Sequence, residues 1–115
     1  MIVRYAAAAA VLALLSNVAS GNDFPTLDRV MFVESCIRDH PERPRQEMLY
    51  KCSCALDAIA EDIAYDDYVE LSTAADAGQI AGERGAAVRE SSVGRDMAKK
   101  FRAVKAQAFS NCLIQ

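Results

Sequence analysis

Apolar residues recur at helical spacing along most of the chain that follows its first 20 positions. In four segments, intervals of three and four residues place apolar side chains on one stripe, which is typical of helices that pack one face against a core. The predicted helices span residues 26–39, 45–64, 66–77 and 95–112. No convincing run alternates apolar and polar residues with the period of a strand. The pattern therefore predicts an all-α fold, a small bundle of about four helices.

Prolines and capping residues suggest how the first three helices are bounded. Pro41 and Pro44 cannot continue a regular helix, so they end the first helix and leave a short connection to the second. Helices joined by a short connection pack antiparallel. Asp23 or Thr26 is a candidate cap for the first helix, and Asp66 is a candidate cap for the third.

Residues 78–94 break the pattern because they contain four of the five glycines of the chain. Glycine is a poor helix former, so we expect an irregular crossover with a helical turn near residues 86–90. A long loop in a compact domain is often functional. Glu83, Arg84 and Arg89 are therefore the candidate partner-binding residues.

The first 20 residues carry a different pattern. Arg4 is their only charge, an apolar run over residues 5–15 follows it, and small residues end the segment at positions 18–20. This is the pattern of a secretory signal, and its apolar core is too short to span a bilayer. We therefore expect a cleaved signal peptide over residues 1–20 and a single helical domain over residues 21–115. The mature protein would be periplasmic or secreted, with no membrane span.

The charged and aromatic residues narrow the possible functions but do not alter the predicted fold. The net charge of −3 argues against a nucleic-acid-binding protein, which is normally basic. Acidic residues gather over positions 57–76 and basic residues over positions 95–105, and the simplest reading is that they face water or each other. Tyr50, Tyr65 and Tyr68 could form an exposed aromatic patch of the kind found at interfaces, or lie at the edge of the core.

The four cysteines are Cys36, Cys52, Cys54 and Cys112. An even count in a short exported domain predicts two disulfides. Cys52 and Cys54 point about 200° apart on a helix, so each should bond a different partner. The favoured scheme joins Cys36 to Cys52 across the short connection and Cys54 to Cys112. The alternative joins Cys36 to Cys54 and Cys52 to Cys112, because Cys52 and Cys112 both lie on apolar stripes.

Patterns for catalysis or cofactor binding are lacking. His40 is the only histidine, no nucleophile is paired with a base, and no second close pair of cysteines completes a metal site. We therefore expect no enzymatic activity, no metal and no cofactor. Whether the protein binds a small ligand is not predicted from the sequence.

Three stretches, "YKCSCALDAIA", "YDDYVE" and "AGERG", precede a basic helix that ends at Cys112. In these features the chain resembles a group of small exported proteobacterial proteins with four cysteines. The resemblance covers residues 32–112. It implies an accessory role beside periplasmic quinoprotein (PQQ) alcohol dehydrogenase systems.

The sequence as a whole favours a non-enzymatic periplasmic accessory or interaction protein that binds another exported protein. The predicted working surface is the segment of residues 78–94. Two alternatives remain open. One is a periplasmic stress chaperone or an immunity-type inhibitor, and the other is a thiolate protein that handles copper or zinc, which requires free thiols.

Overall fold

The computed structural model describes residues 22–115, and the predicted signal peptide lies outside them. This part of the chain forms five helices and no strand: α2 (Thr26–Arg38), α3 (Arg45–Asp62), α4 (Tyr65–Gly78), α5 (Glu83–Glu90) and α6 (Ser92–Asn111). The all-α prediction is confirmed for these residues. None of the helices described is long and apolar enough to cross a membrane.

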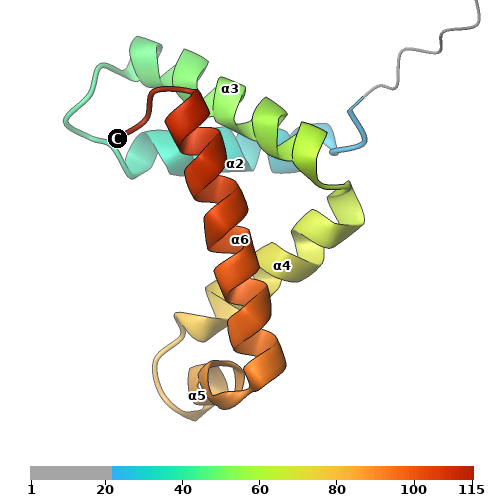
Figure 1. The fold of residues 1–115 in the computed structure, drawn as a ribbon. Coiled ribbons are helices and arrows are strands. Elements are labelled where there is room, and N and C mark those ends of the chain that lie inside the picture. The colour runs from blue at the N-terminus through green and yellow to red at the C-terminus, as the bar shows by residue number, and fades with distance from the viewer. Residues whose placement is uncertain (1–21) are drawn as a thin grey trace, which may run out of the picture.

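The helices follow one another in a simple arrangement (Figure 1). α2 and α3 form an antiparallel hairpin, as the short connection predicts. α4 leaves the end of α3 at an angle, and α5 lies at the far end of the molecule from the hairpin. α6 then runs back from α5 and contacts both α4 and α3. The long last helix therefore ties the hairpin to α4 and α5.

The core is built along α3. Cys52, Ala55 and Ile59 have no exposed surface, and they lie on one stripe of this helix. Buried residues of α2 and of the C-terminal end pack against the first half of the stripe, and Phe24 and Ala108 pack against the second half. A third buried cluster joins α4 to α6. Each helix except α5 thus contributes apolar side chains to these clusters.

Two disulfides fix α3 on both sides. Cys36 bonds to Cys52 and Cys54 bonds to Cys112, which is the favoured one of the two schemes. Cys52 is fully buried whereas Cys54 is exposed, as expected for residues that point in different directions from one helix. The first bond holds α3 to α2, and the second holds it to the end of α6. Two disulfides in a small domain fit an oxidising compartment.

The start of α4 corrects the capping prediction. Asp66 is not the N-cap: that position is Ala64, whose side chain accepts no hydrogen bond. Instead, the backbone N–H of Tyr65 donates to Oδ2 of Asp23 at 3.0 Å. Asp23 therefore satisfies a backbone donor of α4, whereas α2 begins after Pro25 with no side-chain cap. A bond between residues 42 positions apart leaves no local pattern in the sequence.

Residues 78–94 are mostly helical, so the prediction of an irregular crossover is wrong, whereas the helical turn predicted near residues 86–90 is confirmed as part of α5. Gly85 lies inside α5, and Gly94 lies in the first turn of α6. A Cβ atom at Gly85 would lie 1.6 Å from the carbonyl oxygen of Ile80, and one at Gly94 would lie 2.7 Å from that of Val88. These glycines therefore allow close packing of helices and turns rather than breaking the helices.

A short junction separates α5 from α6. The Ser91 side chain accepts a hydrogen bond of 3.2 Å from the backbone N–H of Gly94, so Ser91 is the N-cap of α6. Arg95 donates to the carbonyl oxygens of Arg89 and Glu90, which are free at the end of α5. As a result, α6 begins three residues earlier than its apolar stripe alone predicts.

Candidate functional site

The three predicted partner-binding residues lie on α5 but differ in their contacts. Glu83 and Arg84 are exposed in its first turn. Arg89 donates hydrogen bonds of 2.7–3.3 Å to three carbonyl oxygens around the turn before α5, those of Gly78, Ile80 and Gly82. Arg89 therefore fixes the turn between α4 and α5. Partner binding by these three residues stays a prediction.

We expect Arg89→Ala to lower the free energy of unfolding by about 1 kcal/mol, because three carbonyl oxygens lose a charged donor at an exposed position. Arg84→Ala is the matched control, since it removes the same charge from the same helix. Urea unfolding and hydrogen exchange of the α5 amides would measure the difference. Equal losses in the two variants would contradict the structural role of Arg89.

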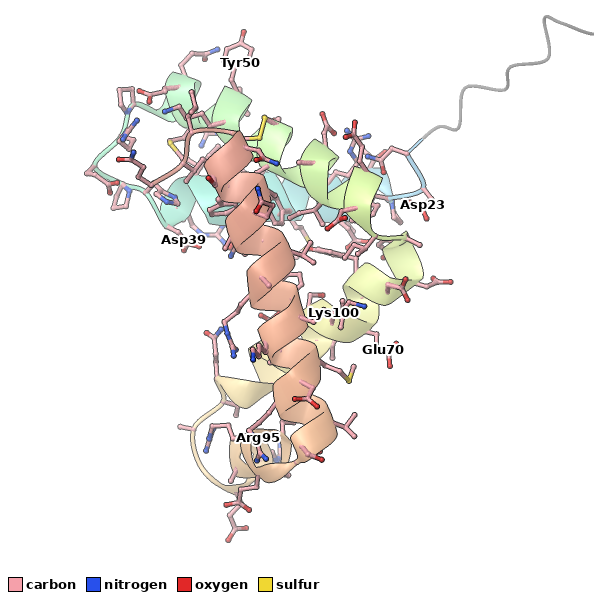
Figure 2. The ribbon with its side chains drawn as sticks, viewed as in Figure 1. Asp23, Asp39, Tyr50, Glu70, Arg95 and Lys100 are labelled. Atoms are coloured by element: carbon pink, nitrogen blue, oxygen red, sulfur yellow. A yellow bond between two sulfur atoms is a disulfide. The ribbon has the colours of Figure 1, made fainter. Side chains whose placement is uncertain are left out.

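Only two of the three candidate tyrosines come together. The rings of Tyr65 and Tyr68 lie 6.4 Å apart, and Phe24 packs against both at 5.3 and 4.9 Å. Tyr50 is 72% exposed and projects outward from α3 (Figure 2). The three tyrosines therefore form no common patch, and the aromatic group belongs to the region between α2 and α4.

A cleft of about 410 Å³ lies in that region. The N-terminal ends of α2 and α4 are close together, and the helices diverge from there, with α6 packed along α4 (Figure 1). One face of α2 forms the first wall, with Asp28, Met31, Phe32 and Ser35 at helical spacing. The wall on α4 runs from Tyr65 to Asp76, and α6 contributes Phe101 and Lys105.

The narrow end of the cleft is closed by a hydrogen bond. The Tyr65 hydroxyl donates to the carboxylate of Asp28 and so joins α4 to α2. This bond raises the pKa of Tyr65, because losing the proton would remove the bond and place a second negative charge beside Asp28. The contact holds the start of α4 against α2.

Tyr68 lies further along the α4 wall. Its ring is half-buried against Phe24 and Phe101, with ring centroids 4.9 and 5.9 Å away. Burial raises the pKa of Tyr68, and the negative charges of Asp76 and Asp28 raise it further. The hydroxyl therefore stays protonated at neutral pH. No side chain or backbone group of residues 22–115 is hydrogen-bonded to it.

The cleft carries uncompensated negative charge. The four ion pairs within residues 22–115 all lie in α2, α3 and the connection between them, and none includes Asp28 or Asp76. Lys105 also lines the cleft, and its ammonium lies 5.2 Å from the ring centroid of Phe109, a residue that does not line the cleft. Two carboxylates thus face the cleft without a basic partner in the described part of the chain.

The acidic and basic segments predicted from the sequence are not joined by ion pairs within the described residues. Glu70 of α4 and Lys100 of α6 line one shallow hollow (Figure 2), yet they form no ion pair. Asp57 is the one member of the acidic segment that pairs, and its partner is Arg29 of α2. Both segments therefore remain exposed charged surfaces.

α2 also presents apolar side chains to solvent. Leu27, Val30 and Met31 are 69%, 52% and 60% exposed and share one face of the helix. Met31 lines the cleft, whereas Val30 lines a second hollow of about 400 Å³ between α2 and α3, together with Leu49. We call Leu27, Val30 and Met31 the α2 stripe. It forms a ridge between the two hollows.

No protein family, curated protein or solved structure matches this chain. All four cysteines are in disulfides, so in this form their sulfurs supply no thiolate for a metal. Within residues 22–115, no group of three or more metal-ligating side chains is present.

The α2 side of this site is not predicted from the sequence. Asp28 and Met31 were not identified as candidates, although their spacing puts them on one helical face. Only the contact between Asp28 and Tyr65 shows that this face lies opposite α4. The candidate site is therefore the cleft with the adjoining α2 stripe.

Proposed function

We propose that this protein is a non-enzymatic interaction protein of an exported compartment and that it binds another exported protein through α2. The observation that carries the proposal is the exposed apolar α2 stripe. Exposed apolar groups rimmed by polar residues mark interaction sites. The disulfide at Cys36 fixes α2 to α3, so little conformational entropy would be lost when a partner binds.

The charges beside the stripe indicate the chemistry of the partner. Asp28 and Asp76 have no basic partner within the described residues, so a complementary surface would combine apolar side chains with a lysine or an arginine. Export is supported by the signal-like pattern of residues 1–20 and by the two disulfides.

An accessory role in a periplasmic oxidation system is the more specific form of this proposal. Its support is the resemblance of residues 32–112 to small exported proteins that occur beside quinoprotein alcohol dehydrogenases. The exported components of such a system are therefore the first partners to test. A chaperone would use the same stripe differently, because it would bind many unfolded proteins rather than one folded partner.

A photo-crosslinking residue at position 31 in the exporting cell tests the proposal. The matched control is position 93, because Val93 is also apolar and 65% exposed but lies at the start of α6. We expect position 31, and not position 93, to crosslink to one exported protein that mass spectrometry identifies.

The purified pair then provides the decisive measurement. Met31→Asp should weaken binding by about tenfold or more, because it places a charge in an apolar contact, and Val93→Asp should leave the affinity unchanged. Crosslinking to many unrelated proteins would favour the chaperone. Equal crosslinking from both positions would contradict a working surface on α2.

A further inference from the structure

We infer that the cleft between α2, α4 and α6 binds an organic cation, an ammonium or guanidinium group carried on an apolar stem. The inference deepens the proposed function and rests on it in one respect: the cation can be a basic side chain of the bound partner. A free small amine has the same chemistry. The site itself is argued from the cleft alone.

The cleft has an excess of negative charge. Asp28 and Asp76 line the cleft from opposite walls and form no ion pair within residues 22–115. The cleft contains one basic side chain, Lys105, and its ammonium is placed over the ring of Phe109 by a cation–π contact. The protein therefore leaves the cleft acidic, and a cation is the group that its field attracts.

Aromatic rings line the same cleft. Tyr65, Tyr68 and Phe101 line the cleft from two helices, and the ring of Tyr68 packs edge-on against Phe101 at 5.9 Å. Aromatic faces attract ammonium and guanidinium groups, and the attraction is stronger where water is partly excluded. The same rings provide apolar contact for the stem of the ligand, as does Met31 on the opposite wall.

The α4 wall of the cleft also offers hydroxyl groups as hydrogen-bond acceptors. The Tyr68 hydroxyl is protonated and has no partner among the described residues, so its oxygen can accept a hydrogen bond from an N–H donor. Ser72 and Thr73 add two further hydroxyls to the same wall. An ammonium or guanidinium group has several donors, so it can bond to one of these carboxylates and to neighbouring hydroxyls of the α4 wall.

The size of the cleft fits this class of ligand. A volume of about 410 Å³ lies within the range of small-molecule sites. The second hollow, between α2 and α3, has a similar volume, but its acidic lining residue Glu34 is paired with Arg45 and no aromatic ring lines it. The combination of unpaired carboxylates and aromatic rings is found in the cleft and not in that hollow.

The test titrates the mature protein with two probes of similar shape, the cation tyramine and the anion 3-(4-hydroxyphenyl)propanoate. Binding is measured by NMR from the changes in the amide chemical shifts of the protein. We expect tyramine to shift the amides of the cleft walls and to saturate below about 10 mM, and the anion to cause no comparable change. Asp76→Asn should weaken tyramine about fivefold or more, because it removes one charge and keeps the shape.

Two further variants complete this experiment. Asp28→Asn should also weaken tyramine while its amide oxygen still accepts the bond from Tyr65, so the fold is kept. Asp67→Asn is the matched control, since Asp67 is exposed on α4 but does not line the cleft. Equal affinity in all three variants, or equal binding of the two probes, would overturn the inference.

The source of the cation is distinguished with a blocked Gly-Arg-Gly peptide and its citrulline counterpart. Binding of the arginine peptide alone would assign the cleft to a basic side chain of a partner, and binding of tyramine without the peptide would assign it to a free amine. No binding of either cation at about 10 mM would refute the site. Because these measurements need no partner, such a failure leaves the crosslinking test of the α2 stripe unaffected.

Discussion

Replacing Cys54 and Cys112 together by alanine should lower the free energy of unfolding by about 4 kcal/mol. The bond closes a loop between residues 58 positions apart, so its loss frees the unfolded chain more than any other single cross-link of this protein. It also releases the end of α6 from α3. Since small domains have about 5–15 kcal/mol of stability in total, the variant should unfold at a much lower temperature.

The second disulfide provides the comparison. Cys36→Ala with Cys52→Ala opens a bond between residues only 16 positions apart, for which chain entropy predicts a loss of about 3 kcal/mol. Both of these cysteines are buried, so the cavity left behind adds to that loss. Urea unfolding followed by circular dichroism would measure both variants. Unchanged stability in either one would contradict a structural role for that bond.

The helices that bury a regular stripe could be predicted closely from the sequence. α2 and α3 begin at the predicted residues, each directly after a proline, Pro25 or Pro44, and they end one and two residues earlier than predicted. The start of α6 was missed because it depends on Ser91 and Arg95, whose hydrogen bonds act at the end of the neighbouring helix. An apolar stripe shows which residues of a helix are buried. The first residue of a helix depends on capping contacts, which the stripe does not include.

The candidate site was less predictable for a related reason. The acidic residues and tyrosines of α4 form a recognisable group in the sequence. Asp28 belongs to another helix and lies 37 positions before its partner Tyr65. A cleft exists only where two helices diverge, and the direction of α4 depends on its packing against α6 as well as on the contacts of Asp23 and Asp28 with Tyr65. The periodic pattern of apolar residues within each helix does not predict the angle between the two helices.

Gly85→Ala should destabilise the protein by about 2–3 kcal/mol, because the new methyl group cannot be placed in the present structure. Its carbon would lie 1.6 Å from the Ile80 carbonyl oxygen and 2.5 Å from the Arg89 guanidinium. Either the turn before α5 or α5 itself must therefore move, and the hydrogen bonds of Arg89 to that turn would be lost.

Gly78→Ala is the matched control, because it makes the same chemical change seven positions earlier. A Cβ atom at Gly78 meets no atom closer than 3.9 Å, and alanine is the better helix former by up to about 1 kcal/mol. We therefore expect Gly78→Ala to keep or raise the stability while Gly85→Ala lowers it, with hydrogen exchange of the α5 amides accelerated in Gly85→Ala alone. If Gly85→Ala were as stable as Gly78→Ala, α5 could not be packed against Ile80, and the glycines of this segment would act as the flexible links that the sequence suggests.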